Sequence, residues 1–342
     1  MRKVIIVGLV VLISIIASIS IVPSTWAHVP KKTEGNNSLE TALEVNDPTK
    51  SWAIYGDIHE DGKARYYRLD LKKDQILRAN LFVPDRGSFV PSLIITGPGL
   101  ENEGSIPDYI EVPEGSNHVV IEGSLGVPEY EPFTPASYYY LADFEKEVED
   151  TGTYHVIVFE PEDHGSYGLA IGKEERYGLI EWVRVPIDII DVREWEGQSL
   201  PLIFLPMILT VIVGLVLLLW FKRDVLTRNY SILMWLATFA GLLYIGTGSM
   251  KFVEMIIAVS KASLGPSVLV TIVFASLPVL LGVFTIRKGM KMGGDVDIKE
   301  RAHLAVYGVL ALFLWAGFVI GPILVFMASL LPSGTSKAKG TR

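Results

Sequence analysis

The stretch Leu200–Phe221, with the sequence LPLIFLPMILTVIVGLVLLLWF, is 22 residues long and contains no charged side chain. A helix of this length rises about 33 Å at 1.5 Å per residue, which is enough to cross the hydrocarbon core of a bilayer. Three later stretches, 230–250, 266–286 and 304–331, have similar lengths and are also free of charge. The sequence therefore predicts a C-terminal α-helical transmembrane bundle of about four helices.

Basic residues are concentrated in two of the loops between these spans. They are Lys222, Arg223 and Arg228 in the first loop, and Arg287, Lys288, Lys291, Lys299 and Arg301 in the third. Loops rich in lysine and arginine stay on the cytoplasmic side of a membrane. This rule places residues 28–199 outside the cell. It would place the polar tail 332–342 outside as well, unless the last span is kinked or re-entrant.

Residues 1–27 predict export of the region that follows them. Two basic residues precede an uncharged apolar run, 4–22, and Thr25 and Ala27 are the small residues expected before a cleavage site. The pattern is typical of a signal peptide cleaved before His28, whereas the length of the run would also suit a retained N-terminal anchor. Export and loop charge together indicate a multi-pass protein of the plasma membrane with its large domain extracellular.

Charge divides the chain into two regions. Residues 28–199 hold 33 acidic and 15 basic side chains, and the rest of the chain holds 5 and 15. A region with this acidic excess repels nucleic acid, so the sequence predicts no nucleic-acid partner. The chain has no cysteine. Disulfides, thiolate metal sites and cysteine nucleophiles are therefore excluded.

Residues 51–176 alternate short β-rich runs with glycine, proline and acidic or amide residues. In the run 75–83, apolar residues such as Leu77 and Leu81 recur at every second position, which predicts a strand with one buried face. Many short strands separated by turn signals predict a β-sandwich, jelly-roll-like in topology. The segment 28–50 is expected to be a polar stretch in front of this domain.

Residues 177–199 have apolar residues near helical spacing among charged ones, which predicts an amphipathic juxtamembrane segment. Trp182 and Trp195 have rings that favour the headgroup level of a bilayer, and they would hold the extracellular domain close to the membrane. Pro186 lacks a backbone N–H, so we expect it to break the segment into two pieces.

Three stretches of the extracellular domain carry a family resemblance. They are 56–75 (GDIHEDGKARYYRLDLKKDQ), 152–159 (GTYHVIVF) and 165–171 (GSYGLAI). They resemble bacterial pre-peptidase C-terminal domains. The resemblance implies a compact β-sandwich, often without catalysis of its own, that sometimes binds calcium or polymeric ligands. The long segment 97–140 departs from that family. The whole chain also resembles archaeal and bacterial membrane proteins with one exported sandwich and a multi-helix tail.

Acidic residues in two loops of this domain are candidate calcium ligands, because calcium prefers hard oxygen ligands. They are Asp57, Glu60 and Asp61 in the first loop, and Glu162 and Asp163 in the second. Their spacing lacks an EF-hand pattern, and ordinary solvated acidic loops are the alternative interpretation.

Two further residues are candidate sites of binding or modification. Cleavage before His28 would place an α-amino group beside an imidazole, and these two nitrogens suit Cu(II). No second histidine is identifiable from spacing, so chance is the competing explanation. Asn36 begins an Asn-Asn-Ser sequon and is a candidate glycosylation site.

No catalytic motif stands out, because neither Gly-x-Ser-x-Gly nor His-Glu-x-x-His is present. The predicted spans also lack the charged residues that mark ion paths. We therefore expect a non-enzymatic membrane protein whose extracellular β-sandwich binds a cation, a glycan or a partner protein at the cell surface or in the membrane. The alternative is a copper-dependent or transport-accessory membrane subunit that uses His28.

Overall fold

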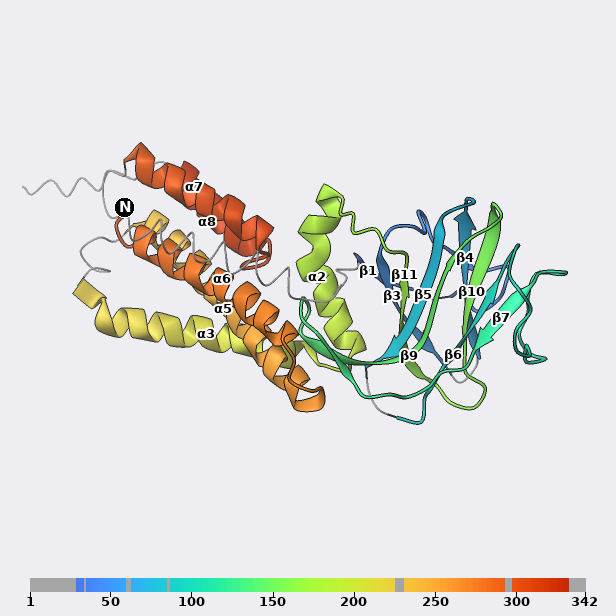
Figure 1. Ribbon diagram of the computed structural model, residues 1–342. Coiled ribbons are helices and arrows are strands. Elements are labelled where there is room, and N and C mark those ends of the chain that lie inside the picture. Colours follow the sequence, from blue (N-terminus) through green and yellow to red (C-terminus); the bar gives the residue numbers. More distant parts are fainter. Residues whose placement is uncertain are drawn as a thin grey trace, which may run out of the picture.

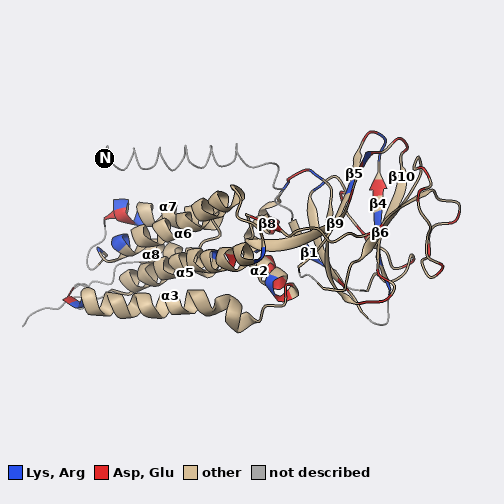
Figure 2. Cartoon of the chain, turned by 60° about the horizontal axis from the view of Figure 1, so that its bottom comes forward, with Lys and Arg blue, Asp and Glu red and all other residues tan. Residues whose placement is uncertain are grey.

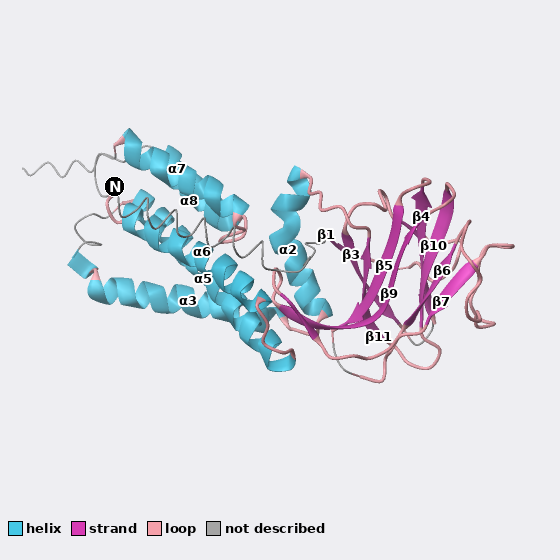
Figure 3. Ribbon diagram, in the orientation of Figure 1, coloured by secondary structure: helices cyan, strands magenta, loops and turns pink. Residues whose placement is uncertain are grey.

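The computed structural model of the protein describes residues 29–33, 35–59, 63–84, 87–224, 231–292 and 297–331. A β-rich region is followed by a helical region, and the helix α2 (Leu179–Trp195) lies between them (Figure 1, Figure 3). The predicted signal segment 1–27, His28 and the tail 332–342 lie outside the described residues.

The β-rich region contains two sheets. The six-stranded sheet has the order β1 (Val29–Lys32), β3 (Trp52–Ile58), β11 (Gly165–Ile171), β5 (Ile76–Val83), β9 (Ala136–Glu147) and β8 (Glu129–Glu131). The five-stranded sheet has the order β2 (Leu43–Glu44), β4 (Ala64–Leu71), β10 (Gly152–Phe159), β6 (Ser92–Thr96) and β7 (His118–Ile121). Neighbouring strands are antiparallel except at the β1–β3 and β2–β4 pairs. Because β1 and β2 fall within residues 28–50, that segment belongs to the sheets and is not a separate polar stretch.

The two sheets enclose one hydrophobic core. Leu77, Ala79 and Leu81 of β5 are no more than 1% exposed, so the alternation predicted for this strand is confirmed. The hydroxyls of Tyr67 in β4 and Tyr167 in β11 share a buried hydrogen bond of 2.5 Å. Since β4 and β11 belong to different sheets, this bond joins the two sheets through the core.

α2 packs on the outer face of the six-stranded sheet through Trp195. Gly168, on this sheet, leaves the space that the ring of Phe82 occupies beneath α2. A Cβ on Gly168 would overlap the ring of Phe82, and that ring lies 6.1 Å from the ring of Trp195 in α2. We therefore expect Gly168→Ala to destabilise the protein by about 1–2 kcal/mol, as overpacking does. Thermal unfolding in detergent measures the change. Gly126→Ala is the matched control, because no atom lies within 4 Å of its added Cβ. Equal melting temperatures for the two variants would contradict the prediction.

Among the described residues, three helices are long and apolar enough to cross a membrane. They are α3 (Leu200–Phe221), α5 (Ile232–Lys261) and α6 (Ser267–Gly289). Charged residues lie mainly near the ends of these helices and over the β-rich region, whereas the middle of the helical region is almost free of them (Figure 2). α5 ends at Lys261 and not at Met250 as predicted, so Lys251 and Glu254 are helical and not part of a loop.

The predicted fourth span, 304–331, is wrong, because this stretch is a helical hairpin. Its two helices are α7 (Ile298–Phe313) and α8 (Ile320–Leu330). Near the start of α7, Arg301 donates hydrogen bonds to the carbonyl oxygens of Ser329 and Leu331 at the end of α8. The two helices are therefore antiparallel, and the chain leaves α8 at the end where α7 begins. The chain therefore reverses its direction within 304–331, in place of the single span expected there.

The reversal between α7 and α8 depends on residues with positive φ. Trp315, Gly317 and Phe318 have φ values of 53°, 68° and 53°, and glycine adopts this conformation at little cost. Gly317 and Gly321 lie against the ring of Tyr244 in α5, where an added Cβ would be 2.8 Å and 2.5 Å from ring atoms. The glycines therefore let the tip of the hairpin pack closely against α5.

Candidate functional site

α2 is one continuous helix that passes through Pro186, so the predicted break at this residue is wrong. A proline lacks the N–H that would bond the carbonyl four residues earlier, which here belongs to Trp182. The indole Nε1 of Trp315, at the tip of the α7–α8 hairpin, donates to this carbonyl oxygen at 2.9 Å. The acceptor that Pro186 leaves free is therefore satisfied by a residue from the helical region, and the helix continues.

α2 is attached to the six-stranded sheet near its C-terminal end and to the residue Lys50, just before β3, near its N-terminal end. The ring of Trp195 lies 4.8 Å from that of Tyr55, and its Nε1 donates to the carbonyl oxygen of Gly56 at 3.2 Å. At the other end, Lys50 Nζ lies 2.6 Å from the carboxylate of Glu181. These contacts fix α2 to the β-rich region along its length.

A buried ion-pair network attaches α2 to the helical region. Arg193 is 4% exposed, and its Nη1 lies 2.7 Å from the Glu196 carboxylate and 3.6 Å from that of Glu254 in α5. The Gln198 amide donates to Glu254 at 2.8 Å, and the Tyr138 hydroxyl donates to Glu196 at 2.6 Å. Burial lowers the pKa of the Arg193 guanidinium, but the two carboxylates outweigh burial and raise that pKa overall. Arg193 is therefore the cation that links β9, α2 and α5.

A second contact joins the β-rich region directly to α6 through the loop between β8 and β9. The Tyr130 hydroxyl bonds Thr271 Oγ1 at 2.6 Å, and Thr271 Oγ1 in turn donates to the carbonyl oxygen of Pro132 at 2.6 Å. The rings of Phe133 and Phe274 lie 5.7 Å apart. The loop therefore packs against a helix that is long enough to cross a membrane.

Glu131 is the last residue of β8, next to this loop, and its surroundings make it a group that titrates near neutral pH. Burial raises the pKa of Glu131 to about 7, a backbone hydrogen bond from Phe133 lowers it, and the charge of Glu175 raises it. A carboxyl with a raised pKa in the folded protein binds a proton that the unfolded chain does not hold between about pH 4.5 and 7. Protonation of Glu131 therefore favours the folded state over that range.

We expect Glu131→Gln to remove one component of the pH dependence of stability. The parent protein should become less stable relative to the variant as pH rises from about 5 to about 8, because ionised Glu131 is penalised by burial only when folded. Thermal unfolding of both proteins at several pH values measures the difference. Glu129→Gln, in the same strand, is the control. A constant difference in melting temperature between parent and Glu131→Gln over this range would rule out the assignment.

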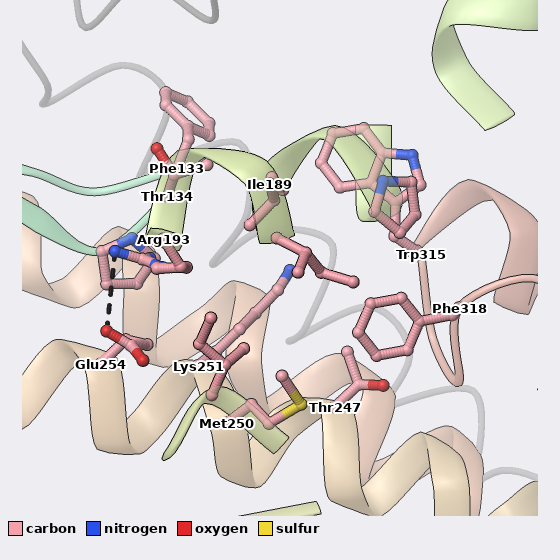
Figure 4. Close-up of a pocket in the computed structure, with 14 residues that line it drawn as sticks. Phe133, Thr134, Ile189, Arg193, Thr247, Met250, Lys251, Glu254, Trp315 and Phe318 are labelled. Carbon is pink, nitrogen blue, oxygen red and sulfur yellow. Dashed lines mark ion pairs between the residues drawn. The ribbon is translucent and has the colours of Figure 1, made fainter. Parts of the chain in front are cut away.

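A partly open cavity of about 70 Å³ lies between the two regions (Figure 4). It lies between α2, α5, the β8–β9 loop and the tip of the α7–α8 hairpin. The apolar part of its wall includes Phe133, Pro186, Ile189, Ile190, Met250 and Phe318. Lys251 and Arg193 also line it, and the two charged side chains approach it from α5 and α2 (Figure 4). The cavity is therefore mostly apolar, and Lys251, Arg193 and the carboxylate of Glu254 are the charged groups at its wall.

The structure does not bring the described candidate calcium ligands together. Asp57 Oδ1 accepts a hydrogen bond from the Ser166 hydroxyl, and Asp163 Oδ1 accepts one from the backbone N–H of His164 at 2.8 Å. Glu162 is exposed. In the part of the chain that the structure describes, no group of three acidic or histidine side chains is placed to hold a metal ion. Two further candidates, Glu60 and Asp61, lie outside that part, so the calcium site stays a prediction, as does copper at His28.

Asn36 is built into the folded domain. It is 2% exposed, and its Nδ2, the atom that would carry a glycan, donates to the carbonyl oxygen of Tyr66 at 3.0 Å. A sugar on this nitrogen would require the buried hydrogen bond to break. The folded conformation therefore disfavours glycosylation at this sequon.

Arg193, Lys251 and Glu254 are the site residues that the sequence did not single out. Arg193 is one charge among several in the amphipathic segment 177–199, and Lys251 and Glu254 follow the end of the predicted span 230–250. One feature of the sequence points to these two residues. Lys251 and Glu254 are three positions apart, so they share a helix face if the helix continues beyond Met250.

No protein-family model matches the chain, and a search of curated proteins finds no relative of it. The contacts of α2 with the β-rich region and with the helical region, which form the junction between the two, are made by Trp195, Arg193 and Glu254.

Proposed function

We propose that the protein is a non-enzymatic, multi-pass protein of the plasma membrane. In this proposal its β-rich region is an extracellular β-sandwich, similar to pre-peptidase C-terminal domains, that binds a cation, a glycan or a partner protein. The observation that carries the proposal is the attachment of α2 to both regions. Trp195 fixes it to the sheet, and the buried pair of Arg193 with Glu254 fixes it to α5. Such a junction suits a domain held in a set orientation close to a bilayer.

The helical region supports membrane insertion with the β-rich region at one end. Ile203 is the one described residue of α3 that is buried, and many apolar residues of this helix, such as Leu209 and Val213, are about half exposed, so a large part of its apolar surface is available to lipid. The basic residues at the start of α7 lie at the opposite end of the hairpin from Trp315, which touches α2. Together with the positive-inside rule, this arrangement favours an extracellular β-rich region and a cytoplasmic end of α7 and α8.

Orientation can be tested with single cysteines, because the natural chain has none. Val127→Cys in the β-rich region and Lys222→Cys at the end of α3 both replace exposed side chains. A membrane-impermeant maleimide should label Cys at 127 on intact cells and Cys at 222 only after lysis. Labelling at 222 on intact cells, with protection at 127, would invert the orientation and remove the basis of the proposal.

Ligand binding can be tested on the full-length protein in detergent. Calcium alone, added after treatment with a chelator, should raise the melting temperature if the ligand is a cation, and Asp163→Asn should abolish that rise. Copper alone tests the alternative that uses His28. If neither metal has an effect, cross-linking in native membranes should capture a partner, and a glycan array should report a carbohydrate. Failure of all these measurements would refute a binding function for the domain.

A further inference from the structure

The cavity at the junction is lined by a cation, Lys251, that forms no ion pair with any of the described residues. The Nζ of Lys251 lies 5.8 Å from the centre of the Trp315 ring. Among the described residues, no carboxylate oxygen lies within 4.0 Å of it. An ammonium group removed from water costs several kcal/mol unless a counter-charge or hydrogen-bond acceptors compensate it. A cation–π contact recovers only about 0.5–2 kcal/mol of such a cost.

Glu254 is the nearest acidic residue along α5, but its charge is already engaged. Its carboxylate accepts a hydrogen bond from the Gln198 amide at 2.8 Å and lies 3.6 Å from Arg193. Figure 4 shows Glu254 directed toward Arg193, whereas the Lys251 side chain extends between Ile189 and the Trp315 side of the cavity. Glu254 also lines the cavity, but its carboxylate is directed toward Arg193, so no carboxylate of the described residues pairs directly with Lys251 and an anion in the cavity could do so.

The surroundings of Lys251 indicate what kind of anion this is. The cavity lies where the apolar helices meet the β-rich region, beside the paired rings of Trp182 and Trp315. Tryptophan is enriched at the headgroup level of a bilayer. The rest of the wall is mainly apolar, so a hydrated inorganic anion would lose its water without gaining hydrogen bonds. An anion attached to a hydrocarbon chain satisfies both the cation and the apolar wall.

We propose that the cavity binds the head of an anionic amphiphile, a carboxylate or phosphate group carried by an acyl or alkyl chain. Lys251 Nζ pairs with the anionic head, and Ile189, Met250 and Phe318 contact the first carbons of the chain. A cavity of about 70 Å³ encloses a few non-hydrogen atoms, so the remainder of the chain lies along the apolar helices in the bilayer. This role is separate from ligand binding by the extracellular domain.

The experiment is isothermal titration calorimetry of the full-length protein in a nonionic detergent. Dodecyl phosphate and dodecanoate are the amphiphilic probes, and inorganic phosphate is the probe without a chain. We expect saturable binding of at least one amphiphile, with inorganic phosphate bound at least about 100-fold more weakly. The stronger of the two amphiphiles identifies whether the head is a phosphate, as in a membrane lipid, or a carboxylate, as in a fatty acid. Inorganic phosphate bound as tightly as dodecyl phosphate would overturn the proposal, as would no saturable binding of either amphiphile.

Three variants connect binding to the cavity. Lys251→Met keeps the length of the side chain and removes its charge, so it should weaken amphiphile binding about tenfold or more. Lys222→Met removes an exposed lysine far from the cavity and should leave binding unchanged within about twofold. Ile189→Phe keeps Lys251 but narrows the cavity, so it should also weaken amphiphile binding. This second variant keeps the test available if Lys251→Met does not fold. Unchanged affinity in Lys251→Met or in Ile189→Phe would show that the probe binds elsewhere.

Discussion

Replacing Arg193 with methionine is expected to lower the free energy of unfolding by about 3–5 kcal/mol, since removing one partner leaves buried charge uncompensated. The guanidinium is 4% exposed and lies between the carboxylates of Glu196 and Glu254. Methionine fills much of the same space, so the lost charge is the main change. Thermal or urea unfolding of the full-length protein in detergent measures the effect.

Two comparisons separate the loss of this network from a general effect of removing an arginine. Arg184→Met removes an exposed arginine of the same helix that pairs with Asp188, and exposed pairs contribute about 1 kcal/mol or less. Neutralising both carboxylates in Arg193→Met/Glu196→Gln/Glu254→Gln should recover much of the lost stability, because no unpaired charge then remains buried. Equal destabilisation by Arg193→Met and Arg184→Met would contradict the proposed role of the network.

The elements that could be predicted from the sequence are those whose pattern is local. α3 was predicted with the same bounds as observed, because 22 uncharged apolar residues leave a membrane helix as the main solution. β5 was predicted from the alternation of Leu77, Ala79 and Leu81. In both cases the residues that decide the structure are neighbours in the sequence, so tertiary contacts do not change the outcome.

The elements that could not be predicted depend on contacts between distant residues. Hydropathy alone cannot distinguish one long span from the α7–α8 hairpin, because both contain the same apolar residues. The turn of the hairpin is also not indicated by its residue types, because Phe318 has a positive φ that phenylalanine rarely adopts. The candidate site could not be predicted for the same reason, because it forms between residues that are distant in sequence. Lys251 and Arg193 acquire their significance only when α5 and α2 meet, whereas the acidic residues that cluster in sequence, such as Asp57 and Asp163, make separate hydrogen bonds.

Replacing Trp315 with phenylalanine is expected to destabilise the protein by about 2–4 kcal/mol. The variant removes the Nε1 donor to the carbonyl of Trp182 and leaves a partly buried acceptor without that partner, at a cost of about 1–3 kcal/mol. The smaller ring also loses part of its contact with the Trp182 ring, 4.6 Å away, and with Lys251. Thermal unfolding in detergent measures the total loss.

A double-mutant cycle with Pro186→Ala isolates the hydrogen bond from the ring contacts. Alanine supplies the N–H that proline lacks, and this N–H can bond the Trp182 carbonyl within the helix. In the Pro186→Ala background, Trp315→Phe should therefore cost about 1–3 kcal/mol less than in the parent protein. Trp315 and Trp182 are 133 positions apart in sequence, so a coupling of this size would show that the hairpin tip keeps α2 continuous. If the two changes add within about 0.5 kcal/mol, the tip only packs against α2, and the continuity of the helix through Pro186 needs another cause.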